Sequence, residues 1–293
     1  MFIYSPSYNF KLDFHIFPVE KYRLLYEKLQ NCGLIPANLF LTPEAITKDD
    51  LLLVHTPEYL DDFLNSRHTP ATAFSEFPIN QEIVSGVLSM VGGTYSAVKE
   101  ALRAGKAMNL GGGFHHAFPD HAEGFCYLND VAIAVAKAQK EKIVKKVLVV
   151  DCDLHQGNGT AFIFKENKDV FTFSIHQENL YPIKQRSSLD IGLDDYTGDQ
   201  EYLTKLSGAL KYIEKHFSPE LLIYIAGADP YEGDQLGTLQ LTKNGLKKRD
   251  HIVMDWAVAR RVPISVVLGG GYAYYIKDVV EIHFNTACEI LKI

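Results

Sequence analysis

Residues 147–160, VLVVDCDLHQGNGT, decide the fold. They begin as an unbroken apolar run, typical of a parallel strand buried on both faces, and continue through alternating polar residues into a glycine-rich turn. Side chains two and four positions apart on an extended chain share one face, so Asp151, Asp153 and His155 are expected to point the same way. The stretch therefore predicts a strand whose carboxyl end forms part of a site.

Short apolar segments and longer helical patterns alternate along the rest of the chain. The segments that predict strands are residues 2–4, 40–41, 107–110, 147–150, 170–175, 221–226 and 264–268. Helices are predicted at residues 19–29, 83–102, 130–138, 160–164, 202–217, 246–261 and 279–291, with a short helix that opens at residues 56–58. This alternation is typical of an α/β fold, with a central and mainly parallel sheet flanked by helices on both faces.

Three further segments carry specific expectations. Residues 2–4 are expected to form a short edge strand, and residues 66–78, which lack a clear period, a mobile surface loop. A long irregular segment is expected between His176 and Asp199.

Length and composition favour a single domain over residues 1–293. The chain is close to the upper size for one hydrophobic core, which is roughly 250 to 300 residues. Hydrophobic residues make up 47% and charged residues 22%, which is ordinary for a globular protein.

Charge and cysteine content narrow the class of protein. The net charge of −7 argues against nucleic acid or an anionic membrane as the main partner, because both are negatively charged. No apolar run approaches the roughly 18 residues that a membrane span needs. The four cysteines show no CxxC spacing that would predict a thiolate zinc site or a disulfide framework. We therefore expect a cytoplasmic enzyme or binding protein.

Five of the predicted strands end in polar or glycine-rich strings. In chain order they read NLGGGFHHAF, DCDLHQGNG, SIHQEN, AGADP and LGGGY. The carboxyl ends of parallel strands line one crevice in this class of fold, so the five strings are expected to meet there. The fingerprint GxGxxG is absent, so a dinucleotide site is not predicted.

The strings contain a residue set that suits a divalent metal. Asp153, His155 and Asp229 offer one nitrogen and two carboxylate oxygens and leave a position open for water or substrate, as in a catalytic site. Zn²⁺ fits this set, and oxygen-rich ligation also suits Fe²⁺ or Mn²⁺. Helix capping at a strand-end turn is the competing interpretation, but it accounts poorly for a carboxylate from a second strand.

The same strings contain candidate acid–base and oxyanion groups. His115 and His116 follow three glycines, and although adjacent histidines in a loop can be coincidental, their place at the crevice favours an acid–base pair. Asp151 lies where it can accept a histidine N–H, and Asn158 can orient the other histidine. Tyr272 can donate to a developing oxyanion.

Together, the strings NLGGGFHHA, GFCYLNDVAIA, VLVVDCDLHQGNGT, AGADP and LGGGY, in this order and spacing, resemble the zinc-dependent histone deacetylase family, which has the arginase/deacetylase α/β fold. The resemblance extends from VHTPEYL at residues 54–60 to the closing helix. The strings HIFPVEKYRLLYEKL and GADPYEGDQLGTLQLTKNGL are more similar to the class IV branch and its bacterial relatives. The resemblance implies one deacetylase-like catalytic domain.

The resemblance also implies roles for the catalytic residues. One Zn²⁺ is held by Asp153, His155 and Asp229. His116 acts as general base and then as general acid, and Tyr272 donates to the substrate carbonyl oxygen.

Two further positions support the histidine pair. His115 is implied to be a charged partner that Asp151 supports. The position of Asn158 is aspartate in many family members. Asparagine is neutral, so it orients His116 without raising its pKa as much.

The family's substrate tunnel and cation site map onto other residues. Phe125 matches one aromatic wall of an acyl-lysine tunnel, Tyr181 matches the other, and Gly124 matches a backbone carbonyl that receives the substrate or the leaving amine. The residues that match the family's inner monovalent cation site, for K⁺, are Asp151, Asp153, His155, Ser174 and Ile175.

The implied activity is removal of an acetyl or longer acyl group from the ε-amine of lysine by metal-activated water. The substrate is then an acyl-lysine protein or peptide or an acylated small amine, with no direct nucleic-acid or membrane binding. Two alternatives are an acetylpolyamine amidohydrolase and a catalytically silent module that binds acyl-lysine. An arginase-like binuclear manganese hydrolase needs more bridging carboxylates than GADP supplies.

Overall fold

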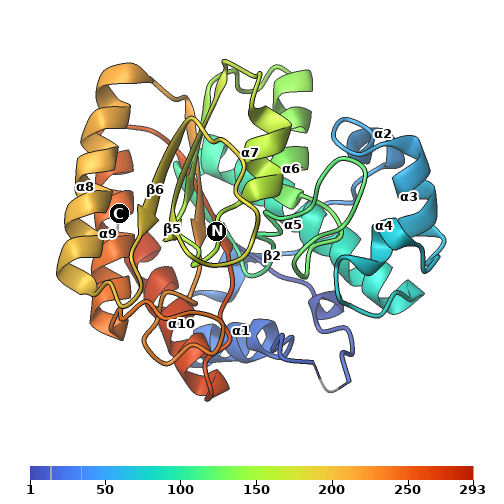
Figure 1. The fold of residues 1–293 in the computed structure, drawn as a ribbon, viewed down its shortest axis with the longest axis horizontal. Coiled ribbons are helices and arrows are strands. Elements are labelled where there is room, and N and C mark those ends of the chain that lie inside the picture. The colour runs from blue at the N-terminus through green and yellow to red at the C-terminus, as the bar shows by residue number, and fades with distance from the viewer. Residues whose placement is uncertain (14, 34, 293) are drawn as a thin grey trace.

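The protein is built on one parallel sheet. The computed structural model describes residues 1–13, 15–33 and 35–292, and within them eight strands pair in the order β2-β1-β3-β8-β7-β4-β5-β6, every neighbouring pair parallel (Figure 1). The strands are β1 (Phe2–Ile3), β2 (Phe40–Leu41), β3 (Lys106–Asn109), β4 (Val147–Asp151), β5 (Val170–Gln177), β6 (Leu189–Leu193), β7 (Leu221–Ala226) and β8 (Ile264–Leu268). Residues 14, 34 and 293, which the single-domain expectation includes, lie outside the described residues.

Helices cover both faces of the sheet. They are α1 (Lys21–Asn31), α2 (Lys48–Leu51), α3 (Pro57–Leu64), α4 (Pro70–Ala73), α5 (Gln81–Ala104), α6 (Asp130–Lys140), α7 (Asn158–Phe164), α8 (Asp199–His216), α9 (Lys243–Ala259) and α10 (Ile276–Lys292), with short 3-10 helices η1 (Pro6–Tyr8) and η2 (Ala37–Leu39). Helices α5, α6 and α7 lie on one side of the sheet and α8, α9 and α10 on the other (Figure 1). Across the described ranges, none of these helices is both long and apolar enough to cross a membrane.

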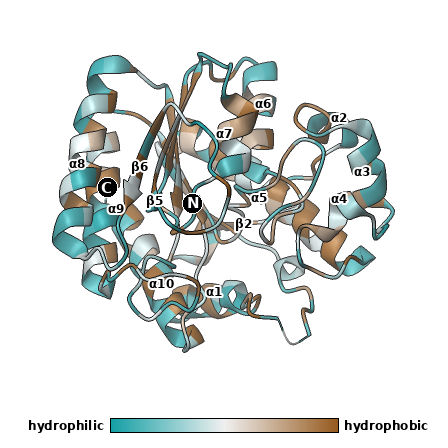
Figure 2. Cartoon of the chain, viewed as in Figure 1, coloured by the Kyte–Doolittle hydropathy of each residue, from teal (hydrophilic) through white to brown (hydrophobic). Residues whose placement is uncertain are grey.

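Burial on both faces explains the apolar runs. Every residue of β4, β7 and β8 is buried, and two apolar clusters fill the space between the sheet and its two helix layers. Figure 2 shows the central strands as hydrophobic and the outer face of α8 as hydrophilic. A strand covered on both sides has no polar face, so it shows no alternation. The predicted α/β sheet with helices on both faces is confirmed.

Local sequence signals set the helix ends. Asn80 accepts the Ile83 N–H at the start of α5, and Gly105 ends this helix with φ of +84°. Thr56 accepts the Tyr59 N–H at the start of α3. A side-chain oxygen before the helix and a left-handed glycine after it satisfy backbone groups that the helix itself leaves unpaired.

Three expectations about segments were wrong. Strand β1 is not at the edge of the sheet, because β2 pairs with it from outside. Residues 66–78 are not a loose loop: they contain α4, and the buried Phe77 ring stacks on Phe125 with centroids 5.5 Å apart. The segment after His176 contains β6, an edge strand whose exposed and half-buried residues alternate and which therefore lacks an apolar run.

The strand order brings the site strings together. Strands β3, β8, β7, β4 and β5, which precede the five polar or glycine-rich strings, are consecutive neighbours in the sheet. In the register of β4, Asp151 lies opposite Ile225 on β7 and Ser174 on β5. The five strings therefore all follow the carboxyl ends of adjacent strands, at the same end of the sheet.

Candidate active site

Asp153, His155 and Asp229 lie together beyond β4 and β7. All three are buried, and each offers a donor atom within 4.8 Å of the others. His155 Nδ1 lies 3.3 Å from Asp153 Oδ1 and 3.4 Å from Asp229 Oδ2. Among the described residues, Asp229 Oδ2 has no hydrogen-bond partner despite its burial. A buried carboxylate oxygen without a partner is costly, so the set fits a cation ligand site.

The electrostatics of these three residues favour positive charge between them. Burial and the neighbouring Asp153 raise the pKa of Asp229 to about 7. Burial opposes the ionisation of Asp153 as well, but His115 and His155 hold the pKa of its carboxyl well below the usual range. Two carboxylates this close repel each other when both are ionised, and a divalent cation removes that repulsion.

A glycine loop after β3 positions the histidine pair. Gly113 has φ of +81°, and a Cβ there would lie 1.7 Å from the carbonyl oxygen of Leu268, so only glycine fits. The buried Asp130 carboxylate accepts the Gly113 N–H at 3.0 Å. The glycine turn and this hydrogen bond place His115 and His116 at the carboxyl end of the sheet, beside the three candidate metal ligands.

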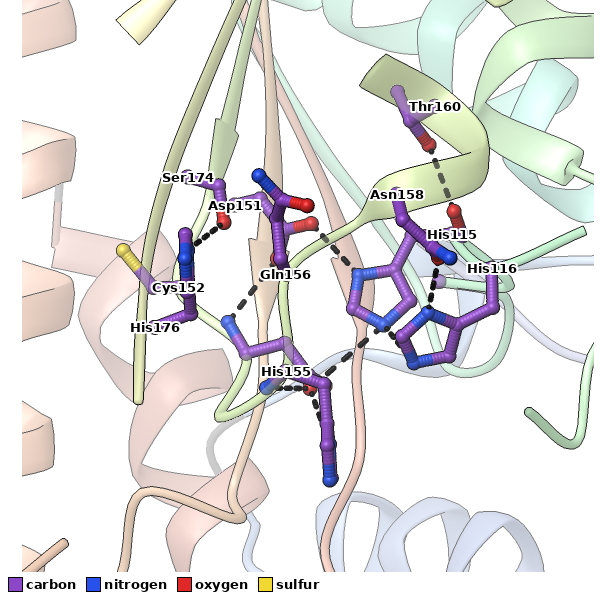
Figure 3. A network of polar contacts seen from close by, with 12 residues as sticks. His115, His116, Asp151, Cys152, His155, Gln156, Asn158, Thr160, Ser174 and His176 are labelled. Carbon is purple, nitrogen blue, oxygen red and sulfur yellow. Dashed lines mark hydrogen bonds and ion pairs between the residues drawn. The ribbon is translucent and has the colours of Figure 1, made fainter. Parts of the chain in front are cut away.

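The two histidines form a chain of polar contacts with their neighbours (Figure 3). His115 Nδ1 lies 2.7 Å from Asp151 Oδ2, and His115 Nε2 lies 3.1 Å from His116 Nε2. His116 Nδ1 lies 2.8 Å from Asn158 Oδ1. Since an amide oxygen only accepts, His116 Nδ1 donates to it, and the Nε2 atom of the neutral ring carries no proton.

The environment gives the two imidazoles different charges. Burial alone would lower the pKa of His115, but Asp151 and Asp153 outweigh it and raise that pKa to about 9. Burial and the charge of His115 hold the pKa of His116 well below its ordinary value. A charged imidazole beside a neutral one is suited to divided acid–base roles.

A narrow pocket opens beside these groups. Residues that line it include His116, Gly124, Phe125, Asp153, His155 and Tyr272. The Phe125 ring lies 5.7 Å from the Tyr272 ring. The half-exposed Tyr181 ring lies 5.4 Å from the His116 ring. Of the two aromatic residues expected as tunnel walls, Phe125 lines the pocket and Tyr181 lies beside His116.

Gly124 lines the pocket and lies tightly against His116 and Tyr181. Its φ is +49°, and a Cβ there would lie 2.6 Å from the His116 ring and 2.7 Å from the Tyr181 hydroxyl. A side chain at this position would clash with both rings.

Tyr272 is buried and keeps its proton. Burial, together with the charges of Asp229 and Asp153, raises the pKa of its phenol well above the ordinary value. Its backbone N–H donates to Asp234 Oδ2 at 2.7 Å, which fixes the chain at this point. The phenol can therefore act as a hydrogen-bond donor in the pocket.

Three of the five residues expected at a monovalent cation site, Asp151, Ser174 and Ile175, lie on the neighbouring strands β4 and β5, and the other two, Asp153 and His155, follow the end of β4. Asp151 is in register with Ser174, and Ile175 follows on the same strand. Asp151 Oδ1 accepts the Asp153 N–H at 3.1 Å, and the Ser174 hydroxyl lies 2.9 Å from His176 Nδ1. Cation binding at these residues stays a prediction.

Sequence reasoning missed three residues around the site. Lys21 is buried in α1 and donates to the Gly269 carbonyl at 3.0 Å. Glu123 contacts Asn158, and Arg249 is fully buried in α9. An isolated charged residue in an amphipathic helix or a loop gives no signal of such contacts. For Arg249, its place three residues after the apolar Leu246 could have indicated the buried stripe.

Arg249 is hydrogen-bonded to the two loops that carry Asp153 and Asp229. Its Nη1 donates to the carbonyl oxygens of Cys152 and Gly227, at 3.2 Å and 2.5 Å. Its Nε and Nη2 donate to Asp250 Oδ1. One buried guanidinium thus links the chain next to Asp153 with the chain that leads to Asp229.

We expect Arg249→Met to lower the free energy of unfolding by about 3 kcal/mol, because it leaves the buried Asp250 carboxylate without its counterion and two carbonyls without this donor. Urea unfolding of the metal-free protein measures this. Arg260→Met, at the end of the same helix and partly exposed, is the matched control and is expected to cost less than about 1 kcal/mol. Equal losses in the two variants would contradict the buried role.

Known proteins resemble the chain over nearly its full length. Residues 15–287 match the model of the histone deacetylase domain. An uncharacterized protein of Picosynechococcus sp. is 40% identical over 284 residues, which cover 96% of this chain and 95% of that protein. Histone deacetylase 2 of Arabidopsis thaliana is 31% identical over 285 residues, which cover 92% and 74% of the two chains. A solved HDAC homolog complexed with SAHA has a TM-score of 0.87 at 25% identity and covers 99% of this chain and 83% of that one.

The fold belongs to the α/β class, and these matches define the protein as a hydrolase that acts on amide bonds. The chain belongs to the histone deacetylase family, as the sequence strings indicate. Membership supports a deacetylase or acylamine amidohydrolase activity. Placement in the class IV branch stays a prediction.

Proposed function

We propose that this protein is a zinc-dependent lysine deacylase, which removes an acetyl or longer acyl group from the ε-amine of lysine in a protein or peptide. The observation that carries the proposal is the buried set of Asp153, His155 and Asp229 beside a histidine pair of unequal pKa, in one pocket with Tyr272. When bound by this set, Zn²⁺ supplies a Lewis acid that acidifies water and polarises a carbonyl oxygen.

The proton transfers fall to the histidine pair. His116 Nε2, which carries no proton, takes one from the attacking water as general base. His116 then returns this proton to the leaving nitrogen, which departs as a free amine. His115 stays charged because Asp151 accepts from it, and its charge stabilises the anionic transition state.

Tyr272 and the tunnel residues position the substrate. The Tyr272 phenol donates to the carbonyl oxygen as negative charge develops there. Phe125 and Tyr181 enclose the alkyl chain of the lysine, and the carbonyl of Gly124 receives the N–H of the substrate or the leaving amine.

The remaining assignments extend this proposal. Residues 1–293 form one catalytic domain, and K⁺ binds as a structural cation at Asp151, Asp153, His155, Ser174 and Ile175. A reducing compartment such as the cytoplasm suits the four free cysteines.

A turnover screen with added zinc tests the activity and its substrate. We expect hydrolysis of acyl-lysine peptides, and acetyl, octanoyl and myristoyl peptides compared side by side reveal the preferred chain length. Faster turnover of acetylated polyamines would transfer the proposal to an acetylpolyamine amidohydrolase. Binding of acyl-lysine without turnover by zinc-loaded protein would overturn the enzyme proposal in favour of a silent binding module.

Tyr272→Phe is expected to lower kcat by about a hundredfold, because it removes one preorganised donor to the oxyanion and leaves the ring in place. Steady-state kinetics on an acetyl-lysine peptide measure the change, and zinc content is expected to remain equal to that of the parent protein. Tyr275→Phe, on an exposed neighbouring ring, serves as the control. A parent-like kcat in Tyr272→Phe would remove the phenol from the mechanism.

A further inference from the structure

Glu123 extends the contact chain of the catalytic histidines by one link. This residue lies on the loop between His116 and Phe125, and its side chain is 21% exposed. Asn158 Nδ2 donates to Glu123 Oε1 at 2.7 Å. The Tyr181 hydroxyl donates to the same oxygen at 3.1 Å. One carboxylate oxygen thus contacts both the amide that holds His116 and a wall of the pocket.

The other carboxylate oxygen of Glu123 lies near His121, a histidine outside the catalytic pair. His121 Nε2 lies 3.6 Å from Glu123 Oε2, and His121 Nδ1 lies 2.7 Å from Asp120 Oδ1. The Oε2 atom therefore lies on the side of His121, and Oε1 lies toward Asn158 and Tyr181.

The chemistry of a carboxylate fixes the direction of this chain. An ionised carboxylate only accepts hydrogen bonds, so Asn158 must turn its NH₂ group toward Glu123 and its carbonyl oxygen toward His116. That oxygen also only accepts, so the proton of His116 lies on Nδ1. His116 Nε2, the atom that faces His115 and the pocket, is therefore left unprotonated.

We propose that Glu123 is a positioning residue that fixes the amide orientation of Asn158 and thereby holds His116 as the tautomer with its proton on Nδ1. The effect of Glu123 on turnover rests on the proposed deacylase function, whereas its effect on the His116 tautomer does not. The carboxylate of Glu123 thus acts on the His116 ring through the Asn158 amide that lies between them.

The shared oxygen also joins the tunnel wall to the histidine chain. Tyr181 lies 5.4 Å from His116 between ring centroids, and its hydroxyl is held by the same Glu123 oxygen that orients Asn158. Loss of Glu123 therefore also removes the hydrogen bond of the Tyr181 hydroxyl. We expect this second loss to raise KM, whereas the change of the His116 tautomer lowers kcat.

Nitrogen-15 NMR of the His116 ring tests the tautomer without turnover. In the parent protein, metal-free and zinc-loaded, we expect a protonated Nδ1 and an unprotonated Nε2. Glu123→Gln removes the restriction, because a glutamine side chain can face either end of the Asn158 amide. We expect a mixture of tautomers in this variant, although His115 still opposes a proton on His116 Nε2. Tyr181→Phe is the control, since it removes the other contact of Glu123 and is expected to leave the tautomer unchanged.

A charge swap tests the same idea by kinetics. Glu123→Gln is expected to lower kcat about tenfold or more, because a catalytic histidine in the wrong tautomer loses orders of magnitude in rate. Asn158→Asp alone places two carboxylates against each other, which then share a proton, and it is also expected to lower kcat. The double variant E123Q/N158D restores one carboxylate and one amide in reversed order. It is expected to exceed both single variants in kcat.

The results separate this proposal from the proposed function. Glu201→Gln, an exposed carboxylate on α8, is the control for the substitution and is expected to keep parent kcat. A parent-like ring spectrum and kcat in Glu123→Gln would overturn the positioning role, and so would a double variant whose kcat does not exceed that of both single variants. If Glu123→Gln does not fold, the double variant, compared with Asn158→Asp, still decides by its rate and its spectrum. An inactive parent protein that nevertheless shows the expected tautomer would refute the deacylase proposal alone.

Discussion

His116→Ala is expected to lower kcat by at least about a hundredfold while the zinc content stays equal to that of the parent protein. The substitution removes the only imidazole of the pair whose environment keeps it neutral, because burial and the charge of His115 oppose its protonation. His115 is a poor replacement as a base, since Asp151 and Asp153 raise its pKa to about 9 and keep its ring protonated. Single-turnover kinetics on an acetyl-lysine peptide measure the chemical step directly.

A matched substitution isolates this effect from a general loss of structure. His251→Ala removes an exposed histidine on α9 and is expected to keep parent kcat. Thermal unfolding checks that both variants remain folded. Near-normal turnover by His116→Ala would exclude this residue as the general base and assign proton transfer to another group.

Asp229→Ala is expected to lose bound zinc, with a fall in affinity of more than about a hundredfold. Loss of groups that merely support metal ligands costs roughly ten- to a hundredfold, and a direct ligand contributes more. Asp229 is also the ligand whose Oδ2 lacks a hydrogen-bond partner among the described residues, so a cation is its natural partner. Inductively coupled plasma measurement after dialysis against a weak chelator gives the zinc per chain.

This measurement is independent of catalysis. Asp255→Ala, on an exposed carboxylate of α9, is the control and is expected to keep the parent zinc content. Stoichiometric zinc in folded Asp229→Ala would refute the ligand set of Asp153, His155 and Asp229. Loss of zinc with retained turnover would instead refute the need for metal in the reaction.

The sequence predicted the sheet well where its strands are covered on both sides. The continuous apolar runs at β4, β7 and β8 have a single interpretation, since each strand is buried throughout. Strand β6 lies at the edge and has exposed positions, so its five residues did not stand out from a loop. The order of the strands, which places β1 inside the sheet, depends on long-range pairing that no local pattern contains.

The candidate site was predicted as a set of residue types but not as a geometry. Alternation along an extended chain predicted a shared direction for Asp151, Asp153 and His155. Strand β4 ends at Asp151, and the bend that follows it brings Asp153 and His155 within reach of Asp229. The opposite pKa shifts of His115 and His116 depend on contacts with other parts of the chain. His115 contacts Asp151 and His116 contacts Asn158, and these contacts form only when the chain folds. The contact of Glu123 with Asn158 spans a loop and a helix start, so no spacing rule predicts it.

The stack of Phe77 on Phe125 has a consequence for how the substrate range of such an enzyme can diverge. Phe77 is buried beneath the ring that walls the pocket, and it belongs to a segment that contributes none of the proposed catalytic or metal-binding residues. A smaller or larger side chain at this position would let the wall retreat or push it inward, while the reacting groups keep their places. Selection on the shape of the pocket can therefore act through a residue behind its wall, and substrate specificity can change while the catalytic residues stay the same.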